Sequence, residues 1–128
     1  MSVLRAVGGG WLSVHAPNQP KAMWLWLLER GFRGVLPSPG PRSVDWRALA
    51  AARDSLPASI VAVSAGGTTT PLRDRPEGGL ATANESDRNL AFAGLRNAVD
   101  LAVAIGVTQV IFEFFGARRG LLADRGFL

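Results

Sequence analysis

The sequence predicts an α/β protein in which parallel β-strands alternate with helices, in about four βα units. Apolar residues between 84 and 105 recur at three- and four-residue spacing, which indicates a helix with one buried face. An apolar, largely β-branched run follows at once from Val107 to Phe115. A strand that is apolar on both sides is typical of a parallel sheet covered by helices. Shorter segments of the same two kinds precede this pair, and the order β-α-β-α-β-α-β implies right-handed crossovers between parallel strands.

The first strand is expected at Trp11–His15, and a loop rich in proline and asparagine follows it. Residues 1–10 are interpreted as a weakly structured lead-in, in which Val3–Val7 is a candidate short strand that three glycines interrupt. A glycine-rich turn binds phosphate where it joins a strand to a helix. Here the glycines lead into the predicted strand, so the sequence argues against a phosphate site at this point.

The middle of the chain shows two further helix–strand pairs. The predicted elements are a helix from Pro20 or Lys21 to Arg30, a strand at Phe32–Leu36, a helix at Trp46–Ser55 and a strand at Ser59–Ala65. Gly31 ends the first of these helices, and Ser43 or Asp45 caps the second. The polar segment Gly66–Ala83 follows as a long loop, and loops of this length are often functional.

The helix over 84–105 carries signals at both of its ends. The side chains of Asn84 and Ser86 can accept the free N–H groups of its first turn, and Glu85 places negative charge at the positive end of the helix dipole. Gly106 stands where a left-handed residue is expected to end the helix. The expected buried face consists of Leu90, Gly94, Leu95, Ala98, Leu101, Ala102 and Ile105.

Size and composition favour one domain over residues 1–128, with residues 117–128 as an incomplete tail. The chain has no cysteine, and we find no secretory signal or membrane-spanning run, so a cytoplasmic location is expected. The net charge is +4, but the thirteen arginines and Lys21 are scattered among acidic residues. Because a nucleic-acid surface typically gathers its cations in a stripe with interleaved aromatics, neither nucleic acid nor membrane is an expected partner.

The segment ESDRNLAFAGLRNAVDLAVAIGVTQVIFE resembles the third helix and fourth strand of the sugar phosphate isomerase/epimerase family, within the xylose isomerase-like TIM barrel superfamily. The matching positions are Arg88, Asp100, Leu101, Ala102, Ile105 and Gly106. GFRGV at 31–35 and SIVAVSAGG at 59–67 resemble the second and third strands of that family. The resemblance covers about residues 11–116, and it implies an architecture like half of a TIM (β/α)₈ barrel.

The resemblance also implies a reaction, namely a metal-assisted proton or hydride shift next to the carbonyl group of a small sugar or sugar phosphate. A divalent cation (Mn²⁺, Mg²⁺ or Zn²⁺) is implied as cofactor, but most of its ligands in the family come from later strands, so the ligand set is incomplete in this chain. The fourth predicted strand would be an unpaired edge, which a natural protein covers or pairs. A homodimer of two half barrels would pair this edge, and an inactive remnant of a barrel is the alternative.

Two residues at the expected strand ends are candidates for catalysis, because the carboxyl ends of parallel strands face the active site. His15 ends the first predicted strand and would be a general base or a metal ligand, the alternative being a histidine that caps a loop. Glu113 is a carboxylate in an otherwise apolar strand, where an unpaired charge is costly. Glu113 would act in catalysis or bind the metal, and the alternative is an ion pair with Arg118 or Arg119.

Polar residues of the neighbouring loops are candidates for substrate binding. Asn18 and Ser38 would hydrogen-bond a polyol, and the alternative for both is ordinary turn chemistry. Ser64, together with Gly66 and Gly67, would bind a phosphate through exposed N–H groups, and the alternative is a loop without a ligand.

Two function classes besides the isomerases stay open. One is a non-catalytic interaction module that uses the open sheet edge together with the apolar tail residues Leu121, Leu122, Phe127 and Leu128. The other is DNA repair of the endonuclease-IV type, which belongs to the same superfamily and needs several histidine ligands. The chain contains one histidine, which argues against this second class.

Overall fold

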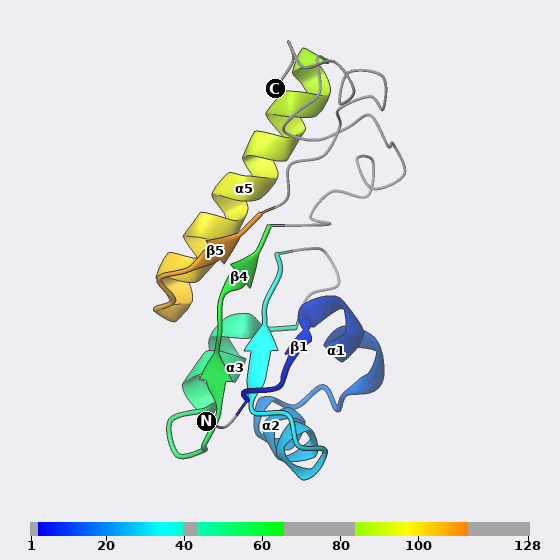
Figure 1. The fold of residues 1–128 in the computed structure, drawn as a ribbon, viewed down its shortest axis with the longest axis vertical. Helices are drawn as coiled ribbons and strands as arrows, with labels where there is room; N and C mark the ends of the chain where they lie inside the picture. The colour runs from blue at the N-terminus through cyan, green and yellow to red at the C-terminus, as the bar shows by residue number, and fades with distance from the viewer. Residues whose placement is uncertain (1–2, 40–43, 66–83, 113–128) are drawn as a thin grey trace.

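The computed structural model describes residues 3–39, 44–65 and 84–112. Their elements in chain order are β1 (Ala6–Gly8), α1 (Gly9–His15), α2 (Pro20–Glu29), β2 (Gly34–Leu36), α3 (Trp46–Ala52), β3 (Ser59–Ile60), β4 (Val63–Ser64), α5 (Glu85–Ile105) and β5 (Val110–Ile111) (Figure 1). The strand pairs formed by these residues are parallel, so the predicted α/β class is confirmed. The predicted loop Gly66–Ala83 lies outside the described residues, as do the last residues of the predicted final strand.

The strands lie side by side in the order in which they occur in the chain. β1 pairs with β2, β2 pairs with β3, and β4 pairs with β5. β3 and β4 belong to one extended segment, which bonds to β2 on one side and to β5 on the other. On the β2 side Val61 N donates to Val35 O at 3.0 Å, and on the β5 side Val63 N donates to Gln109 O at 3.0 Å. The two hydrogen-bonded sheets are therefore joined through this segment, as Figure 1 shows.

The register of the strands sorts their residues onto two faces, because successive side chains of a strand point to opposite sides. Val7, Val35 and Ile60 form one register row across β1, β2 and β3, and Val63 and Val110 form a row across β4 and β5. All five are β-branched and contribute to the hydrophobic core. On the opposite face Ala6, Gly34 and Ser59 form one register row across β1, β2 and β3. This second face also carries larger apolar side chains, since Leu4 and Val61 lie next to Gly34.

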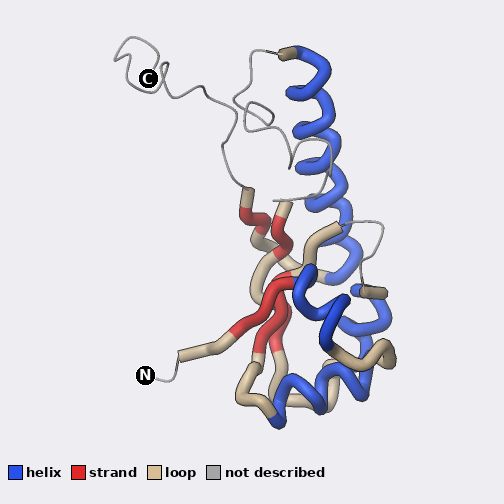
Figure 2. Tube along the Cα trace, turned by 90° about the vertical axis from the view of Figure 1, so that its right-hand side faces the viewer, coloured by secondary structure: helices blue, strands red, loops and turns tan. Residues whose placement is uncertain are grey.

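The described helices form a layer along one side of the strands, as Figure 2 shows. Within this layer α2 packs against α3, and α3 packs against α5. Trp24 of α2 is completely buried, and its indole Nε1 donates to Leu49 O of α3 at 2.8 Å. The largest fully buried side chains are Trp24, Leu12, Met23, Leu27, Leu49, Val35, Val63 and Pro37. The core therefore lies between the helices and one face of the strands.

The expectation of a strand at Trp11–His15 is wrong, because these residues form most of α1. The first strand is β1, which overlaps the candidate short strand Val3–Val7 in the segment expected to be a weakly structured lead-in. β1 fills the place beside β2, where Ala6 is paired with Gly34 and Gly8 with Leu36. A strand beginning at Trp11 would have no free position next to β2. As part of the helix α1, Leu12 is completely buried in the core.

The helix predictions for α2 and α3 are confirmed, with ends that differ by a few residues. Gly31 follows α2 with a φ of 79°, which a glycine adopts at no steric cost. Asp45 is the residue that caps α3, and its Oδ1 accepts the N–H of Ala48 at 3.0 Å. The predicted strands are shorter in the structure, and the segment Ser59–Ala65 is divided into β3 and β4.

α5 follows its local signals at both ends. The side chain of Asn84 accepts the N–H of Asp87 at 3.0 Å, and Gly106 ends the helix with a φ of 71°. The buried positions include Gly94, Ala98, Ala102 and Ile105, as predicted. Leu90 is 41% exposed, so its expected place on the buried face is wrong.

Loss of the Asp45 cap gives a first testable expectation. Asp45→Ala should lower the free energy of unfolding by about 1 kcal/mol, because the N–H of Ala48 then loses its side-chain acceptor. Urea titration followed by circular dichroism measures this change. Asp45→Asn retains an acceptor oxygen and should cost clearly less. Equal losses for the two variants would show that the charge of Asp45, rather than its hydrogen bond, stabilises α3.

Candidate functional site

The carboxyl ends of parallel strands meet at one edge of a sheet, and two of the predicted substrate-binding residues lie there. Ser38 follows β2 after one proline, and Ser64 is the last residue of β4. Ser64 N donates to Pro37 O at 2.7 Å, which fixes the two strand ends side by side. Both serines are partly buried. The structure therefore brings Ser38 and Ser64 to neighbouring positions, although they are far apart in the chain.

The side chain of Ser64 belongs to the sheet face that turns away from the helices. Val63, its neighbour in β4, is completely buried in the core, and successive residues of a strand alternate between faces. Ser64 shares a register row with Ile111 of β5, which is 50% exposed. A ligand at this edge would thus meet a hydroxyl group on the accessible face of the sheet.

Trp46 and Gly9 hold the backbone around Ser38, and the sequence analysis did not single out either residue. The indole Nε1 of Trp46 donates to Ser38 O at 3.1 Å. Gly9 begins α1 directly after β1, and a Cβ atom there would lie 2.5 Å from Cζ2 of Trp46. Only glycine fits at this position without displacing the indole ring. The run of three glycines was the signal in the sequence that pointed to this position. That the run joins a strand to a helix is known only from the structure, which places β1 directly before α1.

His15 lies at the other end of α1 from the strand edge. Six residues of helix separate it from Gly9, which corresponds to roughly 9 Å along the helix axis. The Nδ1 atom of His15 is 2.9 Å from Trp11 O, and since a carbonyl only accepts, Nδ1 carries the proton. The imidazole is exposed and stacks on the Trp11 ring at 4.6 Å between centroids. The expectation that His15 ends a strand is therefore wrong, and its catalytic role stays a prediction.

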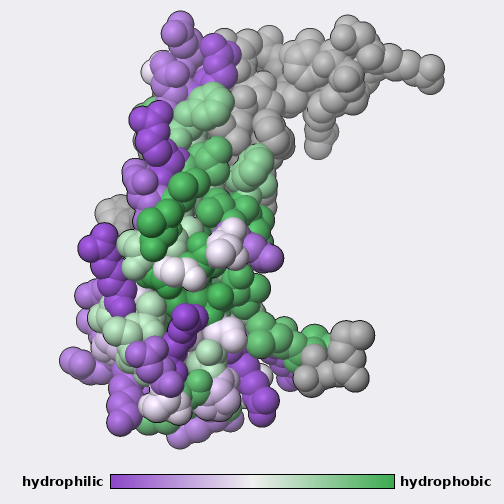
Figure 3. All heavy atoms as spheres, turned by 90° about the vertical axis from the view of Figure 1, so that its left-hand side faces the viewer, coloured by the Kyte–Doolittle hydropathy of each residue, from purple (hydrophilic) through white to green (hydrophobic). Residues whose placement is uncertain are grey.

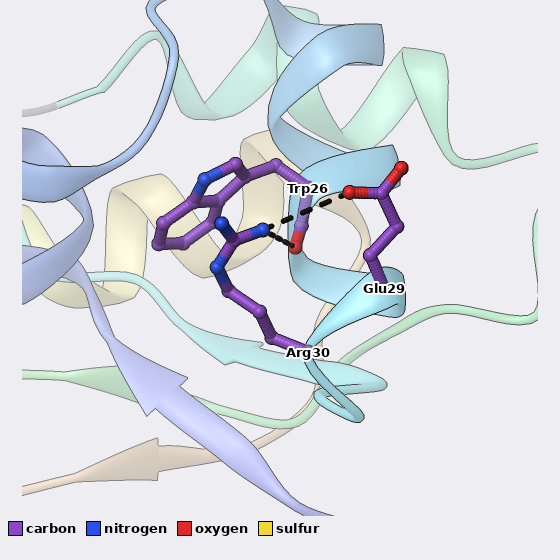
Figure 4. A network of polar contacts seen from close by, with 3 residues as sticks. All are labelled: Trp26, Glu29 and Arg30. Carbon is purple, nitrogen blue, oxygen red and sulfur yellow. Dashed lines mark hydrogen bonds and ion pairs between the residues drawn. The ribbon is translucent and has the colours of Figure 1, made fainter.

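His15 joins an aromatic and cationic cluster through its contact with Trp11. The Trp11 ring centre lies 5.6 Å from Trp26 and 6.4 Å from Phe32. The guanidinium of Arg30 lies 4.0 Å from the centre of the Trp26 ring, and its Nη1 donates to Trp26 O at 3.1 Å (Figure 4). Nη1 of Arg30 is also 3.7 Å from a carboxylate oxygen of Glu29, and the side chains of Arg30 and Glu29 are 46% and 75% exposed. The contact between Trp11 and Trp26 joins α1 to α2, which gives the cluster a packing role.

The other predicted site residues are not brought to the serine edge by the described structure. Asn18 is exposed in the loop between α1 and α2. Gly66, Gly67 and Glu113 lie outside the described residues, so their expected roles stay predictions.

The described residues do not supply a site for the divalent metal that the family resemblance implies. Within residues 3–39, 44–65 and 84–112, no three histidine, aspartate or glutamate side chains gather closely enough to hold an ion. Structural and catalytic zinc sites use three or four protein ligands, and magnesium needs an octahedral shell of oxygens.

Comparison of the chain with models of known protein families, with curated proteins and with solved structures gave no match. In the part of the chain that the structure describes, no helix combines the length and the apolar character needed to cross a membrane.

Proposed function

We propose that this chain folds as half of a barrel of the sugar phosphate isomerase/epimerase type, and that its serine edge binds a sugar or sugar phosphate. The observation that carries the proposal is the placement of Ser38 and Ser64 at neighbouring carboxyl ends of parallel strands. In (β/α)₈ enzymes this end of the strands carries the active site. Serine hydroxyls both donate and accept hydrogen bonds, as recognition of a polyol requires.

The winding of the chain favours a barrel over a doubly wound sheet. In a doubly wound sheet the strand order reverses and helices cover both faces. Here the strands follow one another without a reversal, and the described helices lie along one side. The other face carries Ala6, Gly34 and Ser59 in one row, which suits the crowded interior of a closed barrel.

The chemistry proposed for the complete site is a proton shift next to a sugar carbonyl. Such a shift needs a base within hydrogen-bonding reach of the carbon-bound proton. We assign this role to Glu113 on the basis of its place in the sequence after β5. A divalent metal is part of the proposal through the family resemblance alone, and we assign it no step. A cytoplasmic location belongs to the same proposal.

Ligand binding at the serine edge can be measured by thermal or urea unfolding in the presence of a pentose phosphate, a hexose phosphate and inorganic phosphate. A sugar phosphate at ten times its dissociation constant should stabilise the fold by about 1.4 kcal/mol, because it binds only the folded state. Ser38→Ala and Ser64→Ala should each reduce this gain.

Ser13→Ala is the matched control, since the Ser13 hydroxyl bonds to Gly10 O within α1 and is exposed. A gain that is equal in the wild type and in both edge variants would place the ligand elsewhere. If inorganic phosphate stabilised the fold as much as the sugar phosphates do, the site would recognise phosphate and not the sugar. No stabilisation by any of the three compounds would favour the non-catalytic interaction module, for which the exposed apolar residues described next are the specific observation.

A further inference from the structure

The parallel sheet has two open edges within the described residues. β1 pairs with β2 alone, and β5 pairs with β4 alone. The exposure pattern of β1 agrees, since Ala6 and Gly8 are exposed, whereas Gly34 and Val35 of the central strand β2 are buried. Strand edges of this kind present unpaired N–H and C=O groups that readily accept another strand.

The β5 edge continues into an apolar stripe on α5. Phe92, Val99 and Val103 are 49%, 44% and 77% exposed. Their spacing of seven and four residues places them on one side of the helix. Figure 3 looks onto this side of the molecule and shows hydrophobic residues gathered along α5 and β5, next to a hydrophilic strip on the outer surface. Helix and edge strand thus form one surface, which we call the β5 surface and define by Phe92, Val99, Val103 and Ile111.

The opposite edge carries a second apolar surface. Val3 and Leu4, which lead into β1, are 87% and 49% exposed, and Trp11 of the adjacent α1 is 42% exposed. We call these residues together with β1 the β1 surface. In Figure 1 β1 and α1 lie on one side of the molecule, and β5 and α5 lie on the other.

We propose that the β5 surface of one chain binds the β1 surface of a second copy of the same chain. The two surfaces differ, so the contact is head to tail, and a two-fold axis repeats it. All strands of one copy run in the same direction, so joining β5 to the partner's β1 continues the parallel sheet. One copy supplies four strand positions, namely β1, β2, the β3–β4 segment and β5. Two copies joined at both edges therefore close a ring of eight.

A second copy fits the observations better than an unrelated partner. Each chain has two different open edges with exposed apolar residues beside both, and one further copy provides the missing neighbour of each edge at once. The ring that results has the strand number at which side chains just fill a barrel interior. This inference rests on the edges and not on the proposed sugar site, so either can fail without the other.

The first test is the mass of the chain in solution by light scattering across a concentration series. We expect a dimer for the wild type, and Val103→Glu should weaken it by about tenfold or more because a charge enters the apolar contact. The side chain of Val103 is 77% exposed in one chain, and glutamate has the higher helix propensity, so the variant should fold. Leu25→Glu is the control, since Leu25 lies 45% exposed on α2 outside both surfaces.

A second variant, Val3→Lys, tests the head-to-tail geometry. Alone it should also weaken the dimer, because it alters the other surface. Mixing Val3→Lys with Val103→Glu should restore dimers, since a mixed pair has one unchanged contact and one contact where lysine faces glutamate. A monomeric wild type would overturn the proposal, as would a dimer that Val103→Glu leaves intact. A dimer sensitive to Val103→Glu but not to Val3→Lys would show that two β5 surfaces bind each other instead.

Discussion

Replacement of Trp24 by alanine is expected to lower the free energy of unfolding by about 3–5 kcal/mol. The side chain of Trp24 is completely buried between α2 and the rest of the core. Its removal leaves a cavity and also takes the hydrogen-bond donor from Leu49 O. A loss of this size is a large fraction of the stability of a small domain, so the variant should be partly unfolded at room temperature. Urea or thermal unfolding followed by circular dichroism measures the effect.

Two further variants separate the contributions to this loss. Trp24→Phe keeps most of the buried volume but removes the hydrogen bond to Leu49 O, and it should cost about 1–3 kcal/mol. Leu25→Ala, at the next position of α2, removes a side chain that is 45% exposed and should change stability far less. A Trp24→Ala loss no larger than that of Leu25→Ala would contradict the placement of Trp24 in the core.

Gly9→Ala and Gly10→Ala are expected to change stability in opposite directions. A Cβ atom at Gly9 would lie 2.5 Å from the ring of Trp46, so the ring must move, and its hydrogen bond to Ser38 O is weakened. We expect a loss of about 1–3 kcal/mol, as for overpacking elsewhere in protein cores. No atom lies within 4 Å of a Cβ at Gly10, which is inside α1. Alanine there should stabilise the fold by up to about 1 kcal/mol, because it is the better helix former.

Comparison of the two glycine variants by urea unfolding directly tests whether residues 9–15 form the helix α1. If Trp11 began a strand, both glycines would lie in the turn before it, and the variants would not differ in sign. Equal effects would therefore contradict the placement of α1. A change in the fluorescence of Trp46 in Gly9→Ala, absent in Gly10→Ala, would confirm that the indole contact holds the backbone of Ser38.

The helices α2, α3 and α5 could be predicted because their signals are local. Asp45 and Asn84 each accept an N–H three residues ahead, and Gly31 and Gly106 adopt the positive φ values expected after a helix. Such signals depend on the chemistry of a few neighbouring residues and on the spacing of apolar ones. For the same reason the parallel α/β class followed from the alternation of elements.

The segment Trp11–His15 shows where local signals failed. Its apolar run suits a strand, but the place beside β2 belongs to Ala6–Gly8. Pairing between strands is decided by contacts far apart in the chain, and it overrides the weak preference of a short segment. The predicted position of His15 depended on that strand, so it was wrong as well. In the structure His15 ends α1 and stacks on Trp11, away from the serine edge.

The sequence by itself therefore determined α2, α3 and α5, the residues at their ends and the parallel class, because each arises from neighbouring residues. Only the tertiary structure decided which strands are neighbours, which face the helices cover, and which edges stay open. The contact of Ser64 with the end of β2, and the need for glycine beside Trp46, arise from residues brought together by folding. The spacing of residues along the chain does not predict such contacts, because they form only when segments far apart in the sequence pack around one core.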